Sequence, residues 1–524
     1  MNLKSNYYLK YIATAIVVLL VFGIKVYANE KKFELKTGFQ WYPFIEWDIT
    51  NPSSEGNPFD VMAKVIFTHD KEGDSITTYM FYDKDNIWKF RFTAKIPGDW
   101  SFITISDDEI LNGWTGKVSI KENPDKNAHG FMKSFGNKWG WEGTEEAFVP
   151  QYVMGKYLRA YVKEDSIINI KMIEEDIEEF VNGHGFTGFS FSVEGDWFKD
   201  ENPDPTIYRV LETFITKVHQ LGGGCHIWMW YRNTNALDGE RMNEKDRRNL
   251  RYFAARLGPL PGWSMGYGVD VENGWISTED LEEWKSFLED YMGWRHFLGA
   301  RVGYDEHGAP SELDENYNAP VGDEYTWWLG GDYIGYTSYR PLYDRYSEVI
   351  NHRPEKPSFE EDRFRLRNIA QWNHKDYDEE LTRRGLWHSA MAGGVANIWG
   401  NFLPHEEGVN FRVLNTLGSK PYKNKDQIKT YSLFFENRFL KEFESKRDEE
   451  NLILYTPDYG KIIIYSEDTD VINYENIHLK LDGPVIAVDT KSPYKEIIVS
   501  IKEGEINWKA PYISDWAFAA GDFK

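Results

Sequence analysis

The fold of this chain is decided by the stretch Ser264-Met265-Gly266-Tyr267-Gly268-Val269-Asp270-Val271-Glu272-Asn273-Gly274-Trp275. The stretch begins like a buried strand and ends in two acids, an amide, a glycine and a tryptophan. The next segment predicts a helix, because large apolar residues recur at helical spacing. These residues are Leu281, Trp284, Phe287, Leu288 and Tyr291. A strand, a charged tip and an amphipathic helix form the unit of a β/α barrel, whose chemistry lies at the C-terminal ends of the strands.

Other segments repeat this alternation of strand, loop and helix. The further strands that we predict are 147–154, 187–193, 225–231, 297–302, 332–339, 356–361 and 395–401. Helices are expected at 171–182, 206–221, 244–257, 341–351 and 379–391. Eight units in about 260 residues match the size of a (β/α)8 barrel. A doubly wound open sheet is the alternative α/β fold, but no glycine-rich phosphate-binding loop follows any of the strands.

Segments rich in short strands flank the predicted barrel. From Phe33 to about Lys121, alternating strands are separated by turn residues, which is typical of a β-sandwich. Beyond a helix that begins near Gln427, further short strands predict a second, small sandwich. We therefore expect a signal peptide at 1–28, an N-terminal β-sandwich at 29–125, a (β/α)8 TIM barrel at 126–425 and a C-terminal β-sandwich at 426–524.

The first residues have the features of a cleavable secretory signal. A basic start precedes an apolar run from Ile12 to Ile24, and Ala28 follows at a position suited to cleavage. The run is short for a membrane span and Lys25 ends it, with an uncleaved anchor as the alternative. The single cysteine, Cys225, allows no internal disulfide, which fits a bacterial secreted protein. We expect a protein that is secreted, periplasmic or at the bacterial cell surface.

Composition restricts the partners. The formal net charge of −24 argues against nucleic acid and against anionic membranes, and no membrane contact is expected beyond the signal segment. An anionic sugar is still compatible, because it needs only a local basic pocket. The histidines show no metal-ligand spacing and no H-E-x-x-H or C-x-x-C motif is present, so we expect no metal and no cofactor.

Aromatic residues make up 16% of the chain, and many of them fall at predicted strand ends. Aromatic faces with polar rims bind sugar rings, although core packing is the alternative for each single residue. Arginines near the tips would suit a sulfate or carboxylate on the sugar, with ion pairing as their alternative. The substrate-binding residues that we predict are Trp197, Trp230, Arg232, Asp270, Asn273, Arg301, Tyr336, Tyr339, Arg363 and Trp399.

Acidic residues at two strand tips suit glycosidic cleavage, which needs a proton donor and a second carboxylate. The stretch 264–275 contains Asp270 and Glu272, which are two residues apart and therefore share a face of the predicted strand. The predicted seventh strand offers Glu360 and Glu361, followed by Asp362. Acids directly after a buried strand are costly unless they are used or paired. Pairing with neighbouring arginines is the structural alternative to catalysis.

With these features, the chain resembles secreted bacterial glycoside hydrolases of the clan-A barrel type, in which a β-sandwich of unknown function precedes the barrel. The resemblance at the front rests on residues 65–68, 81–83, 88–93, 97–100 and 111–113, which read VIFT, FYD, WKFRFT, PGDW and LNG. The tail resembles the small sandwich named for collagen binding. In this type of enzyme, glutamates end the fourth and seventh strands, and anomeric configuration is retained.

Carried over, the resemblance implies Glu272 as acid/base and Glu361 as nucleophile. The asparagine that usually precedes the acid/base glutamate is Val271 here, which leaves the choice between Asp270 and Glu272 open. Glu360 and Glu361 are adjacent, so only one can face the axis, and we prefer Glu361. The resemblance also implies that Tyr336 or Tyr339 hydrogen-bonds the nucleophile, and that Trp399 forms the floor of the subsite that holds the cleaved sugar.

Two functional hypotheses follow. The first is a retaining glycoside hydrolase acting on an extracellular polysaccharide or its oligosaccharides. The second is a carbohydrate-binding protein that kept the barrel and lost the chemistry. A lapsed enzyme usually has Gln, Ala or Ser at one of the two tips, whereas both tips here keep carboxylates.

Overall fold

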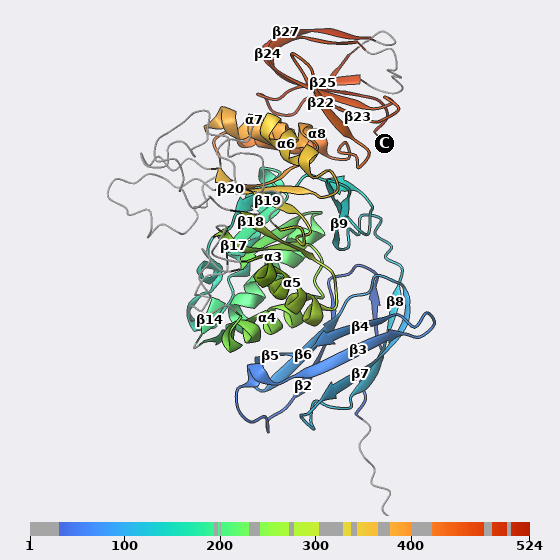
Figure 1. Ribbon diagram of the computed structural model, residues 1–524, viewed down its shortest axis with the longest axis vertical. Coiled ribbons are helices and arrows are strands. Elements are labelled where there is room, and N and C mark those ends of the chain that lie inside the picture. The colour runs from blue at the N-terminus through green and yellow to red at the C-terminus, as the bar shows by residue number, and fades with distance from the viewer. Residues whose placement is uncertain are drawn as a thin grey trace, which may run out of the picture.

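The computed structural model describes residues 31–192, 197–199, 201–229, 242–271, 277–302, 328–336, 343–364, 378–400, 422–475, 485–499 and 505–523. Within these residues the chain forms three parts, stacked along its long axis (Figure 1). N-terminal β-sheets lie at one end, a barrel with its helices lies in the middle, and a C-terminal β-sheet lies at the other end. None of the helices in this described part is long and apolar enough to cross a membrane.

The middle part is a closed barrel of eight parallel strands, as the sequence predicts. Each strand pairs with the next in chain order, and the last pairs with the first. The strands are β12 (Gln151–Met154), β13 (Gly188–Ser192), β16 (Gly224–Met229), β17 (Trp263–Val271), β18 (Phe297–Val302), β19 (Ile334–Tyr336), β20 (Ser358–Phe364) and β21 (Ala396–Trp399). The stretch that begins at Ser264 therefore belongs to the fourth strand, β17. The fold class is the expected (β/α)8 barrel.

Helices follow the strands and cover the outside of the barrel. They are α2 (Ile170–Ile177) with a π-helical turn (Glu178–Gly183), α3 (Pro205–Gln220), α4 (Glu244–Leu257), α5 (Thr278–Met292), α6 (Tyr343–His352), α7 (Glu379–Met391) and α8 (Lys425–Phe435). Local sequence fixes the bounds of α5, which follows the fourth strand. Ser277 and Asp280 form a capping box at its start, and Gly293 ends it in a left-handed conformation with φ of 74°.

A hairpin closes the N-terminal face of the barrel. Its strands are β9 (Met132–Phe135) and β10 (Lys138–Trp141), with β11 (Ala147–Phe148) beside β10. Trp139 is fully buried and donates a hydrogen bond from Nε1 to the carbonyl of Ser358, the first residue of β20, at 3.0 Å. Its ring packs against Phe297, Tyr333 and Phe359 inside the barrel. Trp139 therefore fills the N-terminal end of the barrel interior.

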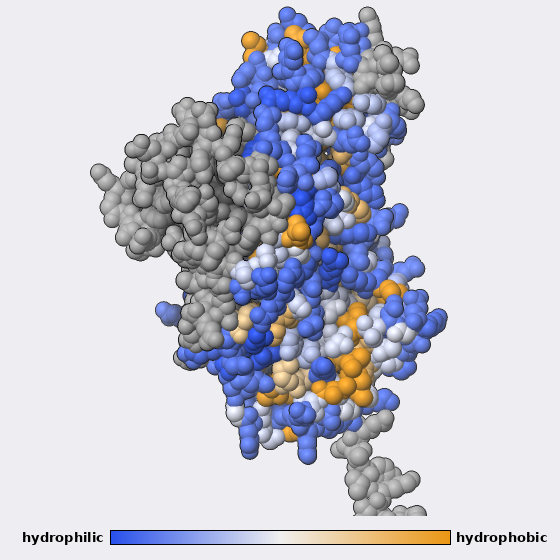
Figure 2. Space-filling view, in the orientation of Figure 1, coloured by the Kyte–Doolittle hydropathy of each residue, from blue (hydrophilic) through white to orange (hydrophobic). Residues whose placement is uncertain are grey.

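The N-terminal part consists of two sheets that pack face to face. One contains β1 (Lys36–Phe39), β8 (Thr115–Lys121), β7 (Gly98–Ser106), β3 (Ala63–His69) and β4 (Ser75–Tyr79). The other contains β2 (Ile45–Thr50), β6 (Ile87–Phe92) and β5 (Phe81–Lys84). Phe67 of the first sheet stacks on Phe92 of the second, with ring centroids 4.3 Å apart. The face in Figure 2 is mainly hydrophilic, and its larger hydrophobic areas lie low in the view, where Figure 1 places these sheets.

A cluster of buried ion pairs joins the N-terminal sheets to the barrel helices. Arg91 of β6 donates to Glu212 of α3 at 2.7 Å, and Arg256 of α4 also donates to Glu212. Arg256 reaches back to Asp83 of β5 at 3.1 Å. Burial alone would raise the pKa of Glu212, but the two guanidinium groups lower it to about 2. The N-terminal sheets are therefore fixed to the barrel by charge as well as by apolar contact.

The C-terminal part is a six-stranded sheet. Its order is β22 (Glu444–Arg447), β23 (Leu452–Tyr455), β24 (Ile462–Glu475), β27 (Glu505–Ala520), β25 (Val485–Asp489) and β26 (Ile497–Ile498). Register shifts near Thr469 bend the β24–β27 pair, so that Ile472 joins the same apolar cluster as Ile453. The other face packs on the barrel helices, where Trp387 of α7 stacks on Tyr465 at 5.1 Å.

Candidate active site

Glu361 lies inside the barrel, on the seventh strand. Side chains alternate along a strand, and Phe359 of β20 belongs to the interior apolar cluster, so Glu361 also faces the interior. Its side chain is fully buried, and Trp228 of β16 donates from Nε1 to Oε2 at 2.9 Å. Glu360 faces the helices, next to Asn397 in the register with β21. Only Glu361 of this adjacent pair therefore projects toward the barrel axis.

Three side chains around Glu361 favour its ionised form. His226 places Nε2 at 3.6 Å from Oε2, and its Nδ1 lies 2.9 Å from the hydroxyl of Ser264. Burial alone would raise the pKa of Glu361. The interaction with His226, the positive charge of Arg301 and a hydrogen bond from Tyr333 outweigh that effect and place the pKa below its ordinary value of 4.5. At neutral pH this buried carboxyl group is therefore a carboxylate.

Arg301 is a predicted site residue that the fold brings to Glu361. It lies on β18, its side chain is buried, and Nη1 donates to the backbone carbonyl of Glu361. Its guanidinium carbon lies 5.6 Å from the centroid of the Trp228 ring. The hydrogen bond from Arg301 fixes the backbone of Glu361, and its positive charge stabilises the carboxylate. Arg301 is therefore engaged with Glu361 and is not a free cation for a sulfated sugar.

Glycines on three neighbouring strands leave the room that the carboxylate occupies. A Cβ atom on Gly335 would lie 2.9 Å from Oε1 of Glu361, and one on Gly266 would lie 3.1 Å from Oε2. A Cβ atom on Gly299 would lie 2.4 Å from the ring of Tyr333. Gly266 belongs to the stretch 264–275, which contains Asp270 and Glu272. Its role is to make space for an acid on another strand.

The tip of the fourth strand is described only in part. Asp270 lies in β17, within the register shift relative to β18 that falls between Tyr267 and Val271. The side chain of Asp270, and Glu272 and Asn273 entirely, lie outside the described residues. The choice between the two acids is therefore still a prediction. The predicted residues Trp230, Arg232 and Tyr339 also lie outside the described residues, as does the side chain of Arg363 in β20.

Three predicted sugar-binding aromatics instead face the layer between barrel and helices. Trp399 is fully buried and donates to Oε1 of Gln151 at 2.6 Å, on the side of the strands that faces α7. Tyr336 follows Gly335, which faces Glu361, so alternation turns its ring outward. Trp197 is fully buried against Tyr208 of α3, with ring centroids 5.5 Å apart. We correct these placements, because none of the three rings is presented to the barrel mouth.

Tyr333, and not Tyr336, is the tyrosine that acts on Glu361 among the described residues, whereas Tyr339 lies outside them. Tyr333 precedes β19 and lies inside the barrel, and its hydroxyl donates to the carbonyl of Met265 at 3.4 Å and lowers the pKa of Glu361. His226 lies in the core, and its Nε2 also approaches the carboxylate of Glu361. The alternation of His226 with Trp228 along β16 would have indicated both residues. No sequence signal singles out Tyr333, because it precedes β19 and lies away from the C-terminal tip of that strand.

Among the residues that the structure describes, no three His, Cys, Asp or Glu side chains form a group that would hold a metal ion. The polar set around Glu361 is built from one acid, one imidazole, one guanidinium and one phenol. Such a set can stabilise an anion that attacks an electrophilic carbon, and it can tune the pKa of that anion.

Comparisons with known proteins agree with this geometry at the level of fold. A family model described as "Domain of unknown function (DUF5060)" matches residues 39–107, in the N-terminal sheets. No curated protein matches the sequence. A candidate glycoside hydrolase from Bacteroides vulgatus ATCC 8482 superposes with a TM-score of 0.65 at 14% identity, covering 93% of this chain and 100% of that one. A glycoside hydrolase family 5 structure from the same organism gives 0.52 at 12%, covering 76% and 94%.

The chain therefore has a glycoside hydrolase-like TIM barrel between an N-terminal DUF5060 domain and a C-terminal β-sheet domain. At these identities the likeness establishes the fold and leaves the reaction to be argued from the site.

Proposed function

We propose that this protein is a retaining glycoside hydrolase that cleaves an extracellular polysaccharide or its oligosaccharides. The observation that carries the proposal is the buried carboxyl group of Glu361 on the seventh strand, with Trp228, His226 and Arg301 around it, and these surroundings hold its pKa below the ordinary value. A buried carboxylate is costly unless its charge is used, and a glycosidase nucleophile is required in this form. The signal-like residues 12–28 support action outside the cytoplasm.

In the proposed mechanism, Glu361 attacks the anomeric carbon while Glu272 protonates the leaving glycosidic oxygen. Water, deprotonated by Glu272, then releases the sugar from Glu361. The two inversions retain the anomeric configuration, and the carboxyl groups are expected roughly 5–5.5 Å apart. His226 and Tyr333 act as positioning residues, because they touch Glu361 and keep its charge. Asp270 is the alternative acid/base residue.

Product stereochemistry tests this proposal. The protein is incubated with neutral, uronate-bearing and sulfated polysaccharides, and the anomeric protons of new reducing ends are followed by NMR from the first minutes. We expect at least one polysaccharide to be cleaved, with the first product in the anomeric form of the substrate. Release of the opposite anomer would exclude a covalent intermediate at Glu361. Binding without any cleavage across the panel would favour the non-catalytic hypothesis.

Replacing Tyr333 with phenylalanine is expected to move the acidic limb of the pH–rate profile to higher pH. The Tyr333 hydroxyl lowers the pKa of Glu361, so its removal raises that pKa and leaves less carboxylate at acidic pH. The measurement is kcat/KM between acidic and neutral pH. Tyr336→Phe is the matched control, since Tyr336 faces the helices, and its profile should not move. An unchanged acidic limb in Tyr333→Phe would contradict the assigned contact.

A further inference from the structure

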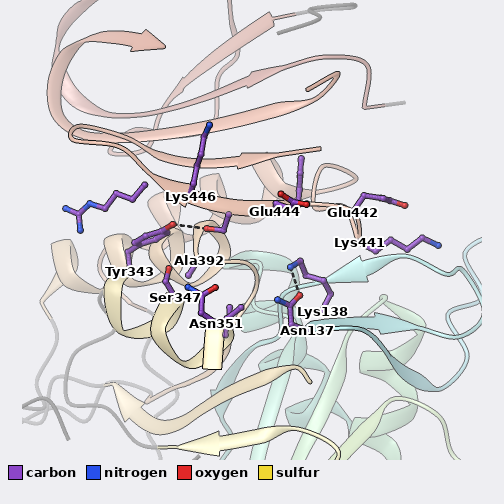
Figure 3. Close-up of a pocket in the computed structure, with 14 residues that line it drawn as sticks. Asn137, Lys138, Tyr343, Ser347, Asn351, Ala392, Lys441, Glu442, Glu444 and Lys446 are labelled. Atoms are coloured by element: carbon purple, nitrogen blue, oxygen red, sulfur yellow. Dashed lines mark hydrogen bonds between the residues drawn. The ribbon is translucent and has the colours of Figure 1, made fainter. Parts of the chain in front are cut away.

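A second cavity lies on the other side of the barrel from the mouth. Its volume is about 610 Å³, and its walls are the β9–β10 hairpin, helix α6 and strand β22 of the C-terminal sheet (Figure 3). The same hairpin plugs the barrel with Trp139, which packs against Phe359. Glu361 lies beyond Phe359 on β20, so packed side chains separate the cavity from the candidate active site.

Lys138 is the unusual residue of this cavity. It is only 4% exposed, and its ammonium group donates to Oδ1 of Asn137 at 2.6 Å. In Figure 3 its side chain reaches from the hairpin into the space between α6 and β22. No carboxylate of the described residues lies within ion-pair distance of it, although Glu442 and Glu444 line the same cavity and the charge of Glu444 acts on it. Burial lowers the pKa of Lys138 to about 8, opposed by the charge of Glu444. A buried cation with a single amide partner is incompletely satisfied.

Polar groups on the opposite wall complete the set. The hydroxyl of Ser347 on α6 is buried and has no hydrogen-bond partner among the described residues. Asn351 lies one turn further along the same helix, and Tyr343 shares a 2.8 Å hydrogen bond with Ser445 of β22. An ammonium group and a hydroxyl group, both short of partners, therefore line the same cavity.

The other cations of the lining are engaged elsewhere. Lys441 lies 4.8 Å from the ring centroid of Phe135 and 3.7 Å from a carboxylate oxygen of Glu145. Lys446 donates to the hydroxyl of Tyr474 at 2.8 Å. Arg447 pairs with Asp344 at 2.7 Å. Lys138 is thus the cation that the lining leaves for a ligand.

We propose that this cavity binds a sugar acid, with its carboxylate on Lys138 and its hydroxyl groups on Ser347 and Asn351. The carboxylate supplies a negative charge in direct contact with Lys138, in a charge-assisted hydrogen bond, whereas Glu444 acts on it only at longer range. The sugar hydroxyls supply the partner that Ser347 lacks. The volume falls in the range of small-molecule sites, and the mostly polar lining disfavours an apolar ligand. The site goes beyond the proposed hydrolysis, because it is remote from Glu361 and needs no catalysis.

Calorimetric titration of the full-length protein with D-glucuronate tests this proposal. We expect saturable binding of glucuronate, at least tenfold weaker binding of D-glucose, and at least a tenfold loss of glucuronate affinity in Lys138→Met, since a hydrogen bond to a charged group is lost. Ser347→Ala, which keeps the ammonium group, should weaken binding several-fold. Lys441→Met, with its ammonium group on Phe135 and Glu145, should bind as the parent does.

Three results would overturn the site. The first is absence of glucuronate binding at millimolar concentration, and the second is unchanged binding in both Lys138→Met and Ser347→Ala. The third is inorganic phosphate binding as tightly as glucuronate, which would indicate a general anion site. Glu361→Gln separates this proposal from the hydrolytic one, because it should leave glucuronate binding unchanged whether or not hydrolysis is lost.

Discussion

The Glu361→Gln variant is expected to lose hydrolysis by about a thousandfold or more, because removal of a nucleophile removes the covalent step itself. Glutamine keeps the size of the side chain and can keep the hydrogen bond from Trp228, so the barrel should stay folded. Sugar binding should remain measurable, since the charge is needed for attack and not for stacking or hydroxyl contacts. The measurement is kcat on the polysaccharide that the wild-type protein cleaves, with binding followed separately.

Glu360→Gln is the matched control, because the same change one residue earlier falls on the face toward the helices. It should retain most of the activity. If Glu360→Gln lost activity while Glu361→Gln kept it, the assignment of the nucleophile would be wrong.

Glu272→Gln should also abolish hydrolysis. Added azide distinguishes the two roles by the configuration of the product. A variant that lacks the acid/base residue should give a glycosyl azide with retained configuration, because azide attacks the intermediate on Glu361, whereas a variant that lacks the nucleophile would give the inverted azide.

Much of the barrel was predictable from the sequence, because the spacing of apolar residues predicts where a helix lies and which of its faces is buried. The helices expected at 244–257 and 379–391 coincide with α4 and α7, and the strand expected at 297–302 coincides with β18. The strand expected at 332–339 contains β19 (Ile334–Tyr336), and its last three residues lie outside the described residues.

The site was harder to predict than the fold, because a side chain's direction depends on the register and the sequence shows only its type. Alternation allowed only one of Glu360 and Glu361 to face the axis, and the preference for Glu361 rested on its place nearer the strand tip; Glu361 faces the interior. Tyr336 and Trp399 were chosen as aromatics at strand ends and face outward. The Cα of Gly335 faces the carboxylate of Glu361, so the next residue, Tyr336, faces the opposite side of the strand. Tyr333 reaches Glu361 from below the strand ends, a position that a search of the tips alone cannot find.

A Glu212→Gln substitution is expected to lower the free energy of unfolding by about 3–5 kcal/mol, as breaking one partner of a buried ion pair does. Arg91 and Arg256 both donate to this carboxylate, and both are nearly fully buried. Without its charge, two guanidinium groups remain in the interface with fewer counter-charges. Urea unfolding followed by tryptophan fluorescence measures the loss. Glu174→Gln is the control, because its pair with Lys217 of α3 is exposed and should contribute at most about 1 kcal/mol.

The pH dependence of the same variant gives a second, independent check. The pKa of Glu212 is about 2 in the folded protein against an ordinary value of 4.5, a difference that corresponds to about 3 kcal/mol. Because the folded pKa is the lower one, the stabilisation is fully present above about pH 4.5 and is lost as pH falls toward 2. The stability gap between wild type and Glu212→Gln should therefore narrow across that interval. A gap that stayed constant from neutral pH to pH 2 would show that the variant acts through packing and not through the charge that joins the N-terminal sheets to the barrel.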